Sequence, residues 1–520
     1  MIRYLQVKTL PQELADWRDQ IEEIASDEGL DFFKTIFEVV GYDKMNEIAA
    51  YDGFPTRYPH WRFGMAYEQL AKSYSYGLSK IYELVINTDP CYAYLLEGNE
   101  LVDQKLVMAH VYGHCDFFKN NFWFSRTDRK MLDTLANHAS RIRRYMDLYG
   151  YSTVERFIDV CLSLDNLIDF HRPYRPSDRQ QDVKPKSDLP DELIGAGMEL
   201  PKLRAKEYMD EFVNTEAYLN TQRERIAEDQ AYDLRHPKSP ERDVLFFLME
   251  NANLTRWQRN VLEMIRDEAY YFAPQRTTKI MNEGWACFWH THIMTRRGVL
   301  DQGEVIDYAD RHSGTTAPRR GSINPYRLGL ELFRDIHERW NKGRFGRDYF
   351  ECESIAERET WDTGTMLGRE KIFEVRRHHN DLTFLDEFLT PEFCAKQRLF
   401  TFENNPRARQ WQIASLEFAE VKRKLLGQLT NMGQPIIEVY DARYQGRNEL
   451  LLTHLYEGVE LDDTYTKPTL KNLYAIWKRP VHIFTRRKEQ RSEETHGVLV
   501  SYDGSQHHEE KIEVFEQASS

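Results

Sequence analysis

Two short segments place ionisable side chains inside apolar helical patterns, so the fold must give these buried groups partners. In the segment Met281–His290, the carboxylate of Glu283 stands among tryptophan, alanine, cysteine and phenylalanine residues. In the segment Met108–His114, His110 and His114 are spaced i, i+4 in similar surroundings. A divalent cation would satisfy all three side chains at once. The sequence therefore predicts that His110, His114 and Glu283 converge as ligands of one divalent metal ion.

Each of these residues also has an ordinary structural explanation. With 17 histidines in 520 residues, about half an HxxxH pair is expected by chance. The two histidines would then be core residues hydrogen-bonded to carbonyl groups, and Glu283 would face the positive end of its own helix dipole. Cys287 and His290 follow Glu283 on the same helix face, at i+4 and i+7. For Cys287 the ordinary role is apolar packing.

The composition excludes several classes of protein. The formal net charge is −14, which gives no electrostatic footprint for nucleic acid or an anionic membrane. The chain has no GxGxxG, no GxxxxGK[ST] and no GxSxG motif. Its six cysteines are scattered without a CxxC pair, as in a reduced, cytosolic protein. We find no signal-peptide pattern and no apolar run near 18 residues, so we expect a cytoplasmic protein without a membrane span.

The hydrophobic periodicity predicts a mainly α fold with a small C-terminal α+β domain. We place the helical body at residues 1–404, with residues 11–160 mostly helical, including the stretch 32–40. A proline-rich, charged stretch at about 172–201 predicts an exposed linker, and helical spacing resumes at 205–225. Within the body, residues 312–326 are rich in Gly, Thr, Ser and Pro and predict a loop.

The C-terminal domain, residues 405–520, has a strand-like texture from about residue 430 onward. Strands are predicted at 435–441, 449–456, 472–477, 480–486 and 497–502. This part lacks paired histidines, cysteines or carboxylates in apolar settings. We therefore expect an interaction module that carries no chemistry.

Four long segments resemble the SpoVR family, that of stage V sporulation protein R. They are HVYGHCDFFKNN at 110–121, EAYYFAPQRTTKIMNEGWACFWH at 268–290, INPYRLGLELFRDIHERW at 323–340 and VRRHHNDLTFLDEFLTPEFC at 375–394. The resemblance covers roughly residues 10–500. It implies a cytoplasmic factor tied to the spore cortex peptidoglycan in spore-formers. Elsewhere it implies a stress-response factor that works beside a PrkA-type serine kinase and a von Willebrand A-like protein.

A second likeness concerns the metal site. The segment HVYGH resembles the HExxH motif of gluzincin metallopeptidases, and NEGWA resembles their NEGFA-type motif. Carried over, this likeness implies a zincin-like helical body in which His110, His114 and Glu283 are the zinc ligands. The chain departs from the motif at Val111, where the general-base glutamate of those enzymes would stand.

If the chain is a hydrolase, another carboxylate must replace that missing base. Glu268 lies 15 residues before Glu283, on a helix that Pro274 should separate from the next. Two helices linked so tightly usually pack antiparallel, which would aim Glu268 at the open side of the metal. The alternative is that Glu268 lies on a solvated helix face or pairs with an arginine. Asp116 is the second candidate for the base.

Two functions of different classes follow from these observations. The first is a metal-dependent hydrolase of sporulation or stress that acts on a peptide or peptidoglycan-precursor bond. The alternative is a catalytically inert regulatory or scaffold protein, with a structural metal or degenerate zincin site, that binds partner proteins of the PrkA-type kinase system.

Overall fold

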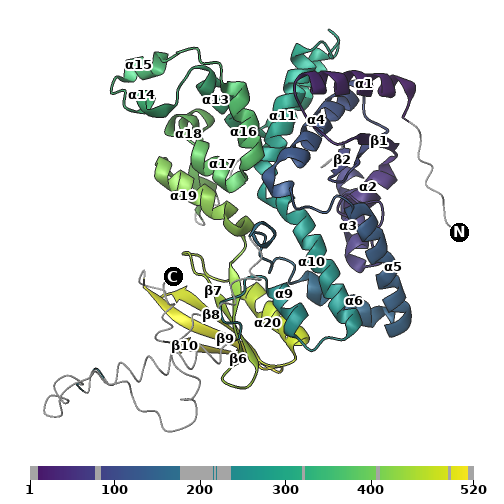
Figure 1. Ribbon diagram of the computed structural model, residues 1–520, viewed down its shortest axis with the longest axis vertical. Coiled ribbons are helices and arrows are strands. Elements are labelled where there is room, and N and C mark those ends of the chain that lie inside the picture. Colours follow the sequence, from purple (N-terminus) through teal and green to yellow (C-terminus); the bar gives the residue numbers. More distant parts are fainter. Residues whose placement is uncertain are drawn as a thin grey trace, which may run out of the picture. The chain divides into compact units, whose positions relative to one another are not determined.

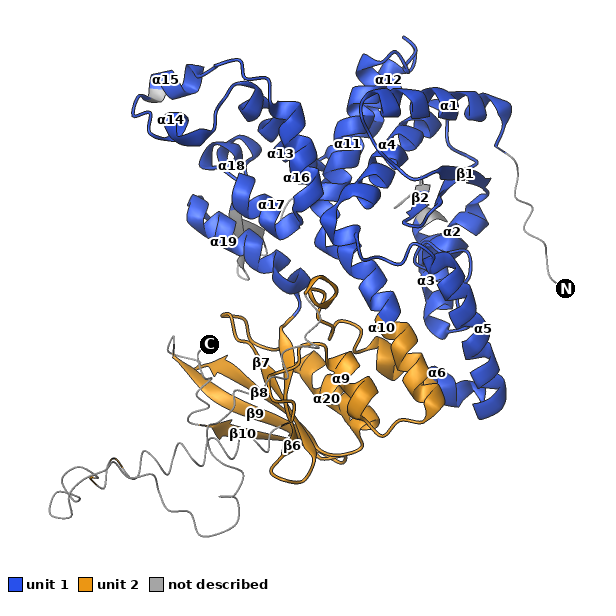
Figure 2. Ribbon diagram, viewed as in Figure 1, with its two compact units in different colours: residues 1–155, 267–434 blue, residues 156–266, 435–520 orange. Residues whose placement is uncertain are grey.

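The computed structural model describes residues 10–75, 83–175, 215, 218, 236–318, 323–405, 410–489 and 494–512. These residues form two compact units, shown in different colours in Figure 2. Unit 1 contains residues 1–155 and 267–434, and unit 2 contains residues 156–266 and 435–520. The sequence placed the boundary near 405, whereas unit 1 continues to 434 and unit 2 also takes in an earlier segment of the chain.

Unit 1 is mainly helical, as Figure 1 shows. Its first segment contains α1 (Gln12–Asp27), β1 (Thr35–Val40), α2 (Tyr42–Ala50), α3 (Trp61–Ser75), β2 (Glu83–Ile86), β3 (Cys91–Leu96), α4 (Leu101–Asn120), the 3-10 turn η1 (Phe122–Phe124) and α5 (Met131–Tyr149). Its second segment contains α11 (Lys279–Arg296), α12 (Val305–Thr316), α13 (Pro325–Asn341), α14 (Gly346–Phe350), α15 (Ile355–Thr360), α16 (Gly368–His378), α17 (Asp381–Phe388), α18 (Pro391–Gln397), β4 (Thr401–Asn405), β5 (Gln410–Ser415), α19 (Phe418–Leu429) and η5 (Thr430–Gly433). Two helices, α6 (Tyr151–Leu162) and α10 (Arg256–Thr277), cross the boundary between the units along the chain.

A three-stranded sheet of order β1-β3-β2 lies in unit 1, in a part of the chain that the sequence predicted to be mostly helical. Strand β1 pairs in parallel with β3, and β2 pairs antiparallel with β3. The helical prediction for residues 32–40 was therefore wrong over Thr35–Val40. Buried and half-buried residues alternate along β1, which is the period of a strand, and its β-branched residues favour that conformation.

The core of unit 1 is built around α4, α11 and α13. Nearly every residue of α4 from Val102 to Phe118 is buried, and the largest fully buried side chains of the described chain are Trp285 and Trp289 on α11. A helix that is buried on nearly every side belongs in a core, packed against other elements. The same core includes Val421 and Leu425 of α19, which explains why unit 1 extends past residue 405.

Unit 2 is built on a five-stranded sheet of order β10-β9-β8-β7-β6. The described elements of this unit, in chain order, are η2 (Arg172–Tyr174), α9 (Val244–Asn251), β6 (Ile437–Tyr444), β7 (Glu449–His454), α20 (Asp463–Trp477), β8 (Val481–Lys488), β9 (Thr495–Tyr502) and β10 (His507–Ile512). Strands β7 and β8 are parallel and all other pairs are antiparallel. The earlier segment joins this unit through backbone bonds between Glu241 and Val439.

The predicted small C-terminal domain with a sheet is confirmed, and four of its five predicted strands correspond to β6 to β9. The fifth, 472–477, was wrong because these residues end α20. A parallel pair of strands needs a crossover, and α20 supplies it between β7 and β8. Of the predicted linker at 172–201, only residues 172–175 are described, and the rest lies outside the described residues. The predicted helix at 205–225 also lies outside them, apart from positions 215 and 218. None of the described helices combines the length and apolar composition that a membrane span requires.

Candidate metal centre

Glycine residues allow the backbones of α4, α11 and α13 to come into contact. A β-carbon at Gly113 of α4 would lie 2.7 Å from the α-carbon of Ala286 on α11. A β-carbon at Gly284 of α11 would collide with the backbone of Gly329 on α13. Because no side chain separates these helices, α4 and α11 present their polar side chains to one another at short range.

Two buried aspartates fix the position of α11. Asp381 of α17 accepts hydrogen bonds from the backbone nitrogens of Ile280 and Met281, at 2.8 and 2.9 Å, and so caps the start of the helix. Burial raises the pKa of Asp381 to about 7, although these backbone donors oppose the shift.

The other aspartate, Asp116 of α4, accepts a hydrogen bond from the indole nitrogen of Trp285 at 2.8 Å. It also forms an ion pair with Arg376 of α16 at 3.3 Å. The carboxylate is therefore engaged in tying α4 to α11 and α16, and the second sequence candidate for a base lies in a structural network.

The three predicted ligands converge between α4 and α11. Oε2 of Glu283 lies 3.5 Å from Nε2 of His110 and 3.5 Å from Nε2 of His114. All three side chains are buried, with residue exposures of 4%, 6% and 7% for His110, His114 and Glu283. Among the residues that the structure describes, Oε2 of Glu283 finds no hydrogen-bond partner. A buried carboxylate oxygen without a partner is costly, so this atom marks a place where something else is needed.

The spacing of these atoms suits a shared ion. Two ligand atoms at Zn–N and Zn–O distances near 2.0–2.1 Å, in tetrahedral geometry, are about 3.3 Å apart. A separation of 3.5 Å is long for a hydrogen bond and close to that value. The donor set of two imidazoles and one carboxylate is also one that zinc accepts. The residues present therefore fit a divalent cation.

The protonation states also suit metal binding. Burial alone would raise the pKa of Glu283, but the neighbouring His110, His114 and Lys279 lower it to about 2, so the carboxylate is ionised. Burial and the neighbouring His110 lower the pKa of His114 to about 4, which keeps its imidazole neutral at pH 7. Both states are those that a metal ligand must have.

Hydrogen bonds on the far side of each imidazole set its tautomer. Nδ1 of His114 lies 2.9 Å from Oδ1 of Asn282, an acceptor, so Nδ1 carries the proton and Nε2 keeps its lone pair. Nδ1 of His110 lies 2.9 Å from Nδ1 of His290, and Nε2 of His290 lies 3.1 Å from Nδ1 of His312. If His110 uses Nε2 as a ligand atom, its Nδ1 is the donor to His290. His290 then donates to His312 through Nε2.

A second group of possible ligands shares one residue with the first. His110, Cys287 and His290 also bring ligand atoms within 4.8 Å of one another. The 2.9 Å between the two Nδ1 atoms is a hydrogen-bond distance and is short for two ligands of one ion. The group that contains Glu283 is therefore the better centre, and His290 is a support for His110.

Glu268, the sequence candidate for the base, lies in a different buried cluster. Its Oε2 accepts a hydrogen bond from the guanidinium of Arg57 at 2.7 Å, and its Oε1 lies 3.4 Å from Nδ1 of His138. The charge of this carboxylate is therefore met by an arginine, which is the arrangement expected of an inert site. Its role as a base stays a prediction.

The expectation that the helices of Glu268 and Glu283 pack antiparallel was wrong. Pro274 lies inside α10, and only Thr278 separates α10 from α11. Figure 1 shows these two helices end to end. A single residue is too short for the reversal of an αα-hairpin, which takes 2–5 residues.

Three supporting residues were not found as site residues from the sequence. His312 lies in the stretch predicted as a loop, but the end of α12 includes it. Asn282 is adjacent to Glu283 and gave no signal, because an asparagine at the start of a helix is common. Asp381 reaches α11 from 100 residues further along the chain, and only its place beside apolar residues could have suggested that it is buried.

These features define a helical protein with a buried centre of two histidines and one glutamate, held by helices in backbone contact. Residues 8–434 match the family model described as SpoVR like protein, and residues 435–488 match the SpoVR-like C-terminal domain. The chain belongs to the SpoVR family. It is 30% identical over 488 residues to a relative from Escherichia coli (strain K12) named Uncharacterized protein YcgB, and the alignment covers 88% of this chain and 89% of the relative. No solved structure matches the chain.

Proposed function

We propose that this protein is a metal-dependent member of the SpoVR family, in which His110, His114 and Glu283 bind one divalent cation. Zinc is the first candidate for this ion. The observation that carries the proposal is the buried Oε2 of Glu283, which lies 3.5 Å from both imidazoles and has no hydrogen-bond partner in the described part of the chain. A cation would satisfy this oxygen and both nitrogen atoms together.

Three protein ligands leave one position of a tetrahedral ion open, which is typical of catalytic zinc sites. An ion held in this way supplies an activated water and polarises a carbonyl or phosphoryl oxygen. On this ground the leading function is a hydrolase of a peptide or peptidoglycan-precursor bond, acting in the cytoplasm during sporulation or stress. The chain itself orients the ligands: Asn282 fixes His114, and Lys279, at 3.1 Å from Oε1 of Glu283, turns Oε2 toward the imidazoles.

A second function has its own support. Glu268 is neutralised by Arg57, and the buried Val111 occupies the place of a general base. Both features favour a regulatory or scaffold protein with a structural metal, which binds partners such as the PrkA-type kinase and the von Willebrand A-like protein. The chain would then share the metal ligands of the zincins but not their catalytic activity.

Metal analysis of the purified chain tests the metal centre. We expect about one equivalent of zinc per chain, or full uptake of one equivalent after titration of the metal-free protein. His114→Ala and Glu283→Gln should lose it, whereas His378→Ala, which removes an exposed histidine of α16, should not. If the analysis finds iron and not zinc, the centre stands but the ion is iron(II), which two histidines and a carboxylate also suit. Retention of metal by both ligand variants would refute the centre.

Complementation of a deletion strain then separates the two functions. A hydrolase that uses Glu268 as base requires that Glu268→Gln and His114→Ala both fail. If Glu268→Gln complements and His114→Ala does not, Glu268 is not the base and the structural metal is favoured.

A further inference from the structure

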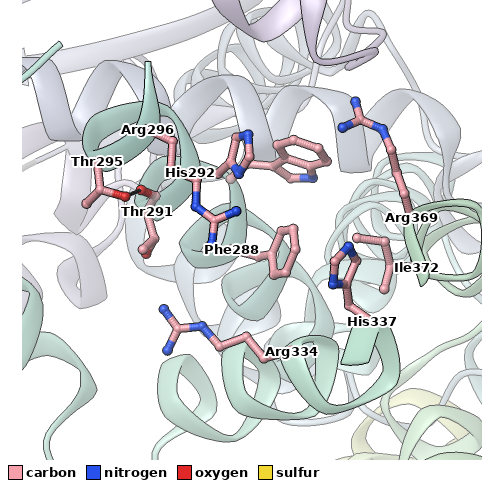
Figure 3. A pocket seen from close by; sticks show the side chains of 10 residues that line it. Phe288, Thr291, His292, Thr295, Arg296, Arg334, His337, Arg369 and Ile372 are labelled. Atoms are coloured by element: carbon pink, nitrogen blue, oxygen red, sulfur yellow. Dashed lines mark hydrogen bonds between the residues drawn. The ribbon is translucent and has the colours of Figure 1, made fainter. Parts of the chain in front are cut away.

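A second polar site lies in unit 1, in a cavity between α11, α13 and α16 (Figure 3). The cavity has a volume of about 300 Å³, which is within the range of roughly 300–1,000 Å³ typical of small-molecule sites. Three helices each contribute one arginine to its lining: Arg296, Arg334 and Arg369. Figure 3 shows Arg296 and Arg334 on one side of the Phe288 ring and His337 on the other.

The carboxylates around this cavity are too few for its cations. Of the lining residues, Arg369 and His292 share the single carboxylate of Glu28, at 3.0 and 3.2 Å. Glu28 also pairs with Arg297 at 2.7 Å, and Arg297 has a second partner in Asp27 at 3.2 Å. Burial would raise the pKa of Glu28, but Arg369 and His292 lower it, so the one carboxylate is ionised and shared.

The other two arginines have even less compensation. Arg334 pairs with the half-buried Glu331 of the same helix at 2.9 Å, and because the arginine itself is exposed, this ion pair contributes little. Within the described ranges, no carboxylate comes within ion-pair distance of Arg296. Figure 3 shows Arg296 and Arg334 on the same side of Phe288, with Arg369 apart from them. Like charges repel one another, and an anion bound between Arg296 and Arg334 would remove that repulsion.

His337 adds a neutral hydrogen-bond donor. Oδ1 of Asn341 accepts from the backbone nitrogen of Gly368 at 2.8 Å, which turns the amide nitrogen of Asn341 toward Nδ1 of His337, at 3.3 Å. Nδ1 is therefore an acceptor, and Nε2 carries the proton. Burial lowers the pKa of His337, and the nearby Arg296 and Arg369 lower it further, so the imidazole stays neutral at pH 7.

The rest of the lining combines apolar surface with one unsatisfied donor. Phe288, Trp289 and Ile372 line the cavity, and the guanidinium of Arg369 lies 5.4 Å from the Trp289 ring centre. Trp289 is 1% exposed, and its Nε1 has no hydrogen-bond partner in the part of the chain that the structure describes. A buried N–H group without an acceptor is rare in a finished core.

We propose that this cavity binds a small phosphomonoester, with its phosphoryl group between Arg296 and Arg334 and its organic part against Phe288. A phosphoryl dianion offers three acceptor oxygens, and guanidinium groups match them in charge and geometry. A carboxylate has one charge and two oxygens, so it would neutralise only one of these two arginines. The inference does not depend on the metal centre.

Calorimetric titration of the full-length protein at fixed ionic strength tests this site. The ligands are phenyl phosphate, inorganic phosphate and benzoate. We expect phenyl phosphate to bind most tightly. Arg296→Ala and Arg334→Ala should each weaken it about tenfold or more, as expected for the loss of a charged hydrogen bond. Both residues are exposed, so neither substitution threatens the fold.

Two controls accompany these variants. Arg377→Ala removes an exposed arginine of α16 outside the cavity, and His114→Ala removes a metal ligand; neither should change the affinity. The proposal fails if Arg377→Ala weakens binding as much as the cavity variants, or if no ligand binds. Equal affinity for benzoate would overturn the preference for phosphate. Equal affinity for inorganic phosphate would identify free phosphate as the ligand and overturn the ester.

Discussion

Unit 1 buries two glutamates on successive helices, and the protein treats them in opposite ways. Glu268 and Glu283 are 5% and 7% exposed. Glu268 has a guanidinium at 2.7 Å, so its charge is neutralised within the fold. Glu283 has two imidazoles at 3.5 Å, and one of its oxygens lacks a hydrogen-bond partner among the described residues.

The comparison shows that burial of a carboxylate does not by itself identify a functional site. The guanidinium of Arg57, at hydrogen-bond distance, neutralises the charge of Glu268, so this carboxylate does not need a metal ion as a partner. The imidazoles of His110 and His114 lie at a longer distance and leave one oxygen of Glu283 without a hydrogen bond among the described residues, so this carboxylate can still take a cation. The kind of partner, and its distance, separates a structural carboxylate from a candidate metal ligand.

The largest expected effect comes from breaking the complete pair. Arg57→Met should lower the free energy of unfolding by about 3–5 kcal/mol, because it leaves the buried Glu268 without its counter-charge. Urea unfolding followed by tryptophan fluorescence measures this. The double variant Arg57→Met/Glu268→Gln should recover much of the loss. If the single variant is as stable as the wild type, Glu268 is not held by Arg57 and the contrast with Glu283 disappears.

Zinc should stabilise the protein through Glu283 and not through Glu268. At a free zinc concentration 100 times the Kd, binding should add about 2.7 kcal/mol to the free energy of unfolding. A shift of the urea midpoint on adding zinc measures it. Glu283→Gln should abolish the shift, and Glu268→Gln, the matched control, should keep it. The opposite pattern would exchange the roles of the two glutamates.

The three candidate ligands could be named from the sequence because each of them stands out against its neighbours along the chain. The spacing of His110 and His114 places both on one face of a helix, and Glu283 contradicts its apolar surroundings. The state of Glu268 could not be predicted, since its partner Arg57 lies 211 residues away. The same applies to His312, which reaches His290 only because α12 packs beside α4 and α13.

The fold was predicted in outline, and its errors have a common cause. Residues 35–40 have apolar side chains at positions that fit either a helix or a strand, and only pairing with β3 decides between them. Residues 472–477 combine β-favouring types, yet they complete a helix because β7 and β8 are parallel and need a crossover. In both segments a partner distant in sequence decided the local structure.

The metal-free protein should lose stability as the pH falls from 7 to 5. The pKa of His114 is about 4 in the fold, below the ordinary value of 6.5, so the unfolded chain binds more protons in this range. Stability from this residue is complete above pH 6.5 and declines toward pH 4. The loss between pH 7 and 5 should be about 2 kcal/mol. Urea unfolding at both pH values measures it, and His114→Gln should show a smaller decline. An equal decline in that variant would assign the pH dependence to other groups.

The smallest expected effect concerns the cation beside Glu283. Lys279→Met removes an ion pair whose lysine side chain is 58% exposed, so the free energy of unfolding should fall by only about 0–1 kcal/mol. Urea unfolding beside Arg57→Met compares the two cations directly. A loss as large as that of Arg57→Met would mean that Lys279 neutralises Glu283 as fully as Arg57 neutralises Glu268, and the proposed difference between the sites would fall.

The glycine contacts between α4, α11 and α13 bear on which ion could enter the centre. Helices in backbone contact at Gly113 and Gly284 cannot move closer, and their buried neighbours oppose separation. The backbones that carry the imidazoles and the carboxylate therefore cannot shift to suit an ion, and only rotation of the side chains can adjust the span. Such a centre suits bonds of about 2.0–2.1 Å and disfavours calcium, which needs about 2.3–2.6 Å and more oxygen ligands than two imidazoles and one carboxylate supply.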